Sequence, residues 1–163
     1  MAATLNSLFP FSTLPQNGVT INPTMVEFEA PVIAGKYVFS TSTTPPKSFG
    51  SLMKGQAGLI AGVMISANCT PADFAANCDK LEMRVLHGGN LTPVNMGAFP
   101  FSTLQAGANF QVNFEITGGD KFPEEDIYIE IAGTVGQIAN MNENVLRLKI
   151  AFNYYRAPAE FLK

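Results

Sequence analysis

The stretch FQVNFEI, residues 110–116, alternates large apolar side chains with polar ones. This two-residue period is that of a β-strand with one buried face and one face in water, and it predicts a strand over residues 109–116. The alternation returns in residues 127–134 and again in residues 145–155. The apolar positions of this last run are Leu146, Leu148, Ile150, Phe152 and Tyr154. Three strands are therefore expected to close the chain.

Four further strands are expected upstream. Residues 26–29 alternate and predict a short strand that ends at Pro31, and residues 36–41 and 80–86 predict two more. Residues 58–66 are apolar without alternation, which favours a strand that is buried on both faces, or one whose outer face meets another subunit.

One short helix is expected near Pro71. Thr70 can cap it, Pro71 fits its first turn, and Asp73 stands three residues after the cap. Seven or eight short strands, one loop helix and glycine-rich turns predict an all-β fold, an antiparallel β-sandwich or barrel.

The sequence also predicts a division of the chain. Residues 1–25 carry no charge and contain several prolines, so we expect an extended N-terminal arm. Residues 26–155 form the β domain, and residues 156–163 are a C-terminal tail. Phe9 and Phe11 of the arm would each cost roughly 1.5–3 kcal/mol if left in water. The arm therefore docks either on its own domain or on a neighbouring subunit, and the sequence leaves both open.

A repeated hexapeptide, FPFSTL, occurs in the arm at residues 9–14 and again at residues 99–104. No other register of the two halves matches, so we do not infer a duplicated domain. A Phe-Pro-Phe segment suits a sheet edge, because proline cannot donate a hydrogen bond to a further strand.

The composition is low in charge. Charged residues make up 14% of the 163 residues, against about 25% in ordinary soluble domains. Such a surface suits contact with other protein molecules. The net charge of −3, with no cluster of Lys or Arg, argues against a nucleic-acid partner. No apolar run approaches the roughly 18 residues of a membrane span. The N-terminus lacks the pattern of a secretory signal, so we expect synthesis and assembly in the cytoplasm.

The sequence offers no complete catalytic or metal-binding set. His87 is the only histidine, and no Gly-x-Ser-x-Gly elbow accompanies its HGG setting, so a turn histidine is expected. Cys69 and Cys78 could pair, but free thiols are the preferred interpretation in a chain with two cysteines. The acidic residues at 120–126 could hold calcium, although their spacing differs from the twelve-residue calcium loop. We predict no catalytic residue, no cofactor and no metal.

Taken together, the uncharged arm, the seven strand runs and the helix near Pro71 resemble the single jelly-roll structural proteins of tailless icosahedral bacteriophages. The resemblance implies two four-stranded sheets and self-assembly into pentamers or trimers beside other coat proteins. It implies a capsid, penton (vertex) or cementing subunit of a virion, assembled in the host cytoplasm, whose arm ties neighbours together. Many capsid proteins that package genomes have a basic arm. This arm is uncharged, so direct contact with nucleic acid is not expected.

The expected role is therefore non-catalytic and depends on buried protein surface. The residues proposed for the assembly interface are apolar or aromatic: Phe9, Phe11, Leu59, Ile60, Val63, Tyr155 and Phe161. The alternative function is a receptor- or carbohydrate-binding β-sandwich of an adhesin or viral fibre, in which Tyr154 and Tyr155 would line a groove.

Overall fold

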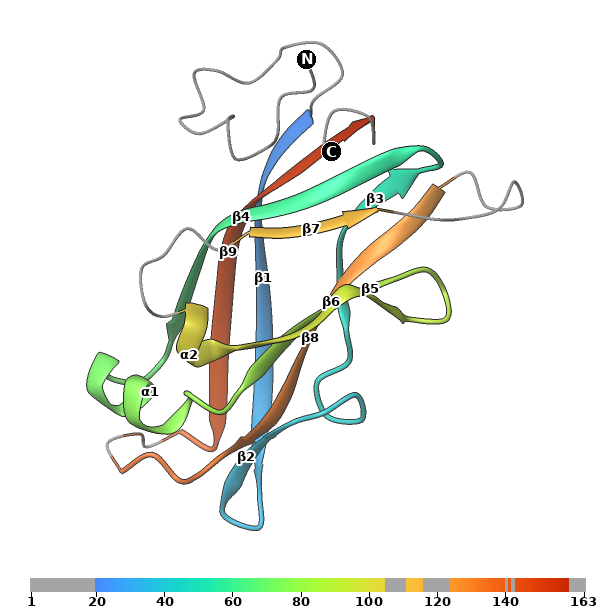
Figure 1. The fold of residues 1–163 in the computed structure, drawn as a ribbon. Helices are drawn as coiled ribbons and strands as arrows, with labels where there is room; N and C mark the ends of the chain where they lie inside the picture. Colours follow the sequence, from blue (N-terminus) through green and yellow to red (C-terminus); the bar gives the residue numbers. More distant parts are fainter. Residues whose placement is uncertain (1–19, 105–110, 116–123, 140, 142, 159–163) are drawn as a thin grey trace.

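The structure, a computed structural model, describes residues 20–104, 111–115, 124–139, 141 and 143–158 (Figure 1). Within these residues the chain forms nine strands, all paired antiparallel, and two short helices. The elements are β1 (Thr20–Ile33), β2 (Lys36–Phe39), β3 (Lys47–Met53), β4 (Gln56–Ala67), α1 (Pro71–Asn77), β5 (Glu82–His87), β6 (Thr92–Pro100), α2 (Phe101–Leu104), β7 (Gln111–Glu115), β8 (Glu124–Val135) and β9 (Val145–Pro158). The prediction of an all-β, antiparallel fold is confirmed.

The strands form two four-stranded arrays. One array has the order β1-β9-β4-β7, and the other has the order β3-β8-β5-β6. The short strand β2 pairs with both β1 and β8, and so links the arrays at one end. Figure 1 shows β1 and β9 side by side along most of their length.

Both arrays contribute one face to a common hydrophobic core. On β9 every second residue from Leu146 to Tyr154 is at most 4% exposed, and on β8 Ile127, Ile129 and Ile131 are fully buried. Phe49 of β3 reaches across the core, where its ring lies edge-on to Phe152 and Tyr154 with centroids 5.2 Å apart in each case. The alternation predicted for β8 and β9 is therefore confirmed.

The strand predicted at residues 109–116 is β7, which pairs with β4. Its flanking residues 109, 110 and 116, and the direction of its side chains, lie outside the described part of the chain. Helix α1 begins where the sequence predicts. The Thr70 side chain accepts a hydrogen bond from the Asp73 N–H at 3.2 Å, and Pro71 occupies the first turn.

The structure corrects the predicted start of the β domain. β1 begins at Thr20 and continues through Pro31 to Ile33, so residues 20–25 belong to the sheet and not to an extended arm. The prolines are tolerated because Pro23 and Pro31 sit at positions whose main-chain groups point away from β9, so no hydrogen bond to β9 is lost. At the other end, β9 extends to Pro158 and shortens the predicted tail.

Three elements are absent from the sequence prediction: β3, β6 and α2. The pairing of β3 with β8 shifts register between Ser48 and Gly50, and this bulge breaks the two-residue period. β6 is the end strand of its array and contains Pro93 and Pro100. The second FPFSTL copy spans the end of β6 and all of α2, and the first copy lies outside the described residues.

Candidate assembly surface

The outward face of the β1-β9-β4 sheet carries an exposed apolar row. Ala151 of β9 lies opposite Met25 of β1 on one side and opposite Met64 of β4 on the other. Met25 is 63% exposed and Met64 is 73% exposed, the largest values among the bulky apolar residues whose side chains the structure describes. We call Met25, Ala151 and Met64 the methionine row. It offers two flexible thioether side chains on either side of a small residue, a chemistry common at binding surfaces.

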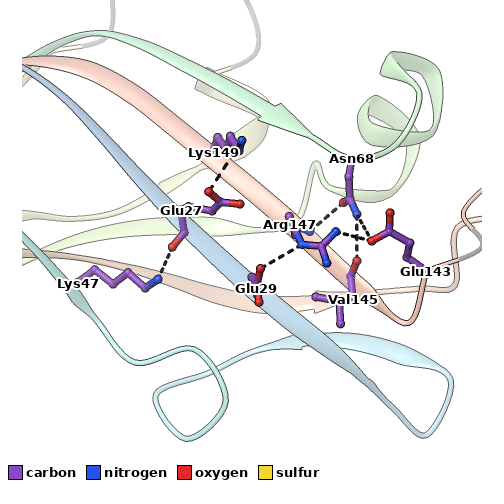
Figure 2. Close-up of polar contacts among 8 residues, drawn as sticks. All are labelled: Glu27, Glu29, Lys47, Asn68, Glu143, Val145, Arg147 and Lys149. Atoms are coloured by element: carbon purple, nitrogen blue, oxygen red, sulfur yellow. Dashed lines mark hydrogen bonds and ion pairs between the residues drawn. The ribbon is translucent and has the colours of Figure 1, made fainter.

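Charged residues continue the same face, and they are paired within it (Figure 2). Next to the methionine row, Glu27 faces Lys149, with 3.9 Å between Oε2 and Nζ. One step further, the Arg147 Nε donates to the Glu29 Oε1 at 3.0 Å. These are exposed cross-strand pairs, which contribute little to stability individually. Their consequence is that Glu27 and Glu29 are compensated by Lys149 and Arg147 on this face.

Arg147 is also tied to the loop before β9. Its guanidinium donates a hydrogen bond to the Glu143 carboxylate as well as to Glu29, and these two bonds raise the pKa of Arg147 above its ordinary value, Glu143 contributing most. The Tyr37 hydroxyl of β2 donates to the main-chain carbonyl of Glu143 at 2.9 Å. Burial raises the pKa of the Tyr37 phenol, so it stays a hydrogen-bond donor.

Asn68, just after β4, fixes the beginning of β9. Its Oδ1 accepts from the Arg147 N–H at 2.8 Å, and its Nδ2 donates to the Val145 carbonyl at 3.1 Å and to the Glu143 carboxylate at 3.4 Å (Figure 2). Arg147 and Glu143 therefore join β1, β2, β4 and β9 at one end of the sheet. This network holds the Arg147–Glu29 pair in place on the same face as the methionine row.

At the other end of β9, the outward face is closed. Tyr155 and Ala157 alternate with the core residue Tyr154, so they face outward, yet they are only 1% and 0% exposed. Burial raises the pKa of the Tyr155 phenol. The outward face of β9 is thus covered within the chain at Tyr155. It is open from Ala151 toward the beginning of the strand.

The structure describes the side chains of three of the seven residues predicted for the assembly interface, Ile60, Val63 and Tyr155. Ile60 is fully buried in the core, Tyr155 is buried, and Val63 is half-buried against the core. Ile60 and Tyr155 are therefore not part of the exposed surface of the chain. Leu59 of β4 lies opposite Tyr155 of β9. The structure does not describe the side chain of Leu59, and Phe9, Phe11 and Phe161 lie outside the described residues.

Sequence reasoning missed Met64 because β4 changes register. Its pairing with β9 shifts between Ala61 and Met64, so the inward positions change from Ile60 to Ile65. An apolar run without alternation does not reveal such a bulge. Met25 was missed because residues 20–25 were not expected to be a strand.

The residues considered for chemistry do not form a site in the described part of the chain. His87 ends β5, ahead of a turn, and Cys69 and Cys78 are free thiols at opposite ends of α1. Burial raises the pKa of both thiols, and that of Cys78 to about 12, which makes them poor nucleophiles near neutral pH. No three His, Cys, Asp or Glu side chains among the described residues gather as metal ligands. Asp120, in the acidic stretch, lies outside those residues.

Within the described ranges, no helix is long and apolar enough to cross a membrane. No known protein-family model matches this chain, and no curated protein sequence is significantly similar to it.

Proposed function

We propose that the protein is a non-catalytic structural subunit of a virion, a capsid, penton or cementing protein that acts through self-assembly. The observation that carries this proposal is the methionine row on a sheet face whose neighbouring charges are already paired. A partly apolar face whose neighbouring charges are paired suits burial against another protein subunit. The low charge of the whole sequence points the same way.

We also propose that the fold is a jelly-roll sandwich. Counting β2 and β3 as one interrupted strand, the first strand pairs with the last (β1 with β9) and the second with the second-last (β2 and β3 with β8). The inner pairs are β4 with β7 and β5 with β6. This nesting is that of one long hairpin rolled up into two facing sheets, which is the winding of a jelly roll. Jelly rolls are frequent in viral capsids, but they also occur in lectins, so the fold supports the proposed role without assigning it.

The partner is a second copy of the chain or a neighbouring coat protein. A pentamer or trimer follows from the resemblance to small virion proteins. Obligate interfaces commonly bury more than about 2,000 Å². The methionine row covers only part of such an area, so it would be the centre of an interface that also takes in residues around it.

The experiment is to measure the mass of the full chain by sedimentation velocity and native mass spectrometry over a wide concentration range, alone and with coat proteins encoded beside it. The proposal predicts a closed oligomer of defined stoichiometry or a stable complex with one of those proteins. A chain that stays monomeric at high concentration and binds none of them would contradict it. A glycan array tests the adhesin alternative, in which selective glycan binding replaces assembly.

A further inference from the structure

One edge of β1 pairs with β9, and we call the opposite edge its second edge. We infer that Lys47 blocks the addition of another strand at this second edge, and so prevents strand-to-strand association between copies of the chain. This inference concerns the edge of the sheet and does not depend on the proposed function, which uses the sheet face.

Among the residues that the structure describes, no strand covers most of the second edge of β1, the edge that faces away from β9. On its first edge, β1 pairs with β9 without a register shift from Thr20 to Pro31. On its second edge, the described strands pair with β1 only at Val32 and Ile33, which face β2. An edge of this kind presents main-chain donors and acceptors that can template a further strand.

Two hydrogen bonds determine which residues point to that edge. In an antiparallel ladder the N–H and C=O of a residue point to the same side, and the sides alternate along the strand. The Lys47 Nζ donates to the Glu27 carbonyl, away from β9, whereas the Val32 N–H donates to the Asn144 carbonyl at 3.1 Å, on the β9 side. The main-chain N–H and C=O groups of the odd-numbered residues of β1 therefore point to the second edge.

Two of these odd-numbered residues are prolines. Pro23 and Pro31 have no N–H, so the donors that remain between them on this edge are those of Met25, Glu27 and Glu29. Lys47 occupies the carbonyl of Glu27, the middle residue of the three. An added strand would need both main-chain groups of that residue for a continuous ladder. Lys47 therefore interrupts pairing at the centre of the stretch between the two prolines.

The position of Lys47 is fixed by three contacts. Lys47 is the first residue of β3 and pairs opposite Ile129 of β8, which sets its main chain beside β1. Its Nζ lies 5.5 Å from the centroid of the Phe28 ring, in addition to its bond with the Glu27 carbonyl (Figure 2). The bond links the two arrays, and it places an ammonium group where an incoming strand would have to lie.

Charge repulsion reinforces this protection against a second copy. If the β1 edges of two copies paired antiparallel around Glu27, the two Glu27 side chains would face each other. The Lys47 ammonium would then also be displaced from its carbonyl into a crowded edge.

The test replaces Lys47 with methionine, which keeps the aliphatic stem and removes the donor. By sedimentation velocity, Lys47→Met is expected to show a mass that rises with concentration above the wild-type mass at the same concentration. Lys36→Met is the matched control, since it removes the same charge from the exposed first residue of β2, and it is expected to sediment like the wild type. An unchanged mass for Lys47→Met, or an equal rise in Lys36→Met, would overturn the inference.

A second substitution assigns the association to the edge. Glu27→Pro removes the central N–H of the second edge and no hydrogen bond to β9, so alone it is expected to remain folded by circular dichroism. Added to Lys47→Met, it is expected to return the mass to that of the wild type. Unfolding of the single Glu27→Pro variant, or association that persists in the double variant, would refute the edge assignment. Because each comparison is made with the wild type, a wild type that proves monomeric would contradict the proposed function and leave this test intact.

Discussion

Gly50 of β3 lies directly against the ring of Tyr154 of β9, so that a β-carbon at Gly50 would be 2.6 Å from the tyrosine Cε1. Tyr154 cannot move away easily, because it is 1% exposed, is packed edge-on against Phe49, and donates its hydroxyl to the Ser51 carbonyl at 3.0 Å. Glycine at the β3 bulge therefore lets the two arrays approach each other.

Gly50→Ala is expected to destabilise the fold by about 1–3 kcal/mol through overpacking. Urea denaturation followed by circular dichroism measures the change in the free energy of unfolding. Gly89→Ala is the control, because a β-carbon at Gly89 would meet no atom within 4 Å. Equal stability of the Gly50→Ala variant and the wild type would mean that the arrays are not in this contact.

Asn68→Ala is expected to lower the free energy of unfolding by about 1–3 kcal/mol, because the N–H of Arg147 and the carbonyl of Val145 lose their side-chain partner. Asn90→Ala, in the exposed turn between β5 and β6, is expected to change it by less than about 0.5 kcal/mol. The same denaturation measurement compares them. An equal effect of the two variants would contradict the role of Asn68 in fixing the start of β9.

Alkaline pH is expected to destabilise the protein. Burial raises the pKa of the Cys78 thiol from 9.0 to about 12, so the folded state holds this proton more tightly than the unfolded state. The resulting stabilisation is complete below pH 9 and is lost as the pH rises toward 12. Burial also raises the pKa of the phenols of Tyr37 and Tyr154, which adds to the loss above pH 10. Urea midpoints at pH 8, 9 and 10 should fall for the wild type and fall less for Cys78→Ala. Parallel curves for the two proteins would disprove the contribution of Cys78.

The sequence predicted those strands whose side chains alternate without interruption. β8 follows the two-residue period from Ile127 to Ile131 and β9 follows it from Leu146 to Tyr154, and α1 has its cap, proline and acidic residue at the expected positions. β3 was missed because its bulge at Ser48 and Gly50 adds a residue to the period. The predicted strand was shorter than β1 because prolines such as Pro23 and Pro31 usually end a strand. Whether they remove a hydrogen bond depends on which edge of β1 is unpaired, and this is a property of the assembled sheet.

The candidate surface was harder to predict than the fold. Apolar residues in the run at 58–66 were expected to meet a partner, but the bulge after Ala61 determines which of them face outward. Ile60 faces the core and Met64 faces outward as a result. Single-sequence periodicity also cannot pair Met64 with Met25, because the two become neighbours only through Ala151 of the strand between them.

The most direct test of the proposed assembly compares the concentration dependence of mass for the wild type and for Met25→Gln/Met64→Gln, measured by sedimentation velocity. If the methionine row is the centre of the assembly interface, the double variant should need roughly tenfold higher concentration, or more, to assemble. Met53→Gln is the control, because Met53 is 51% exposed at the end of β3, outside the row, and it should assemble like the wild type. Assembly of the double variant at the wild-type concentration would contradict the account.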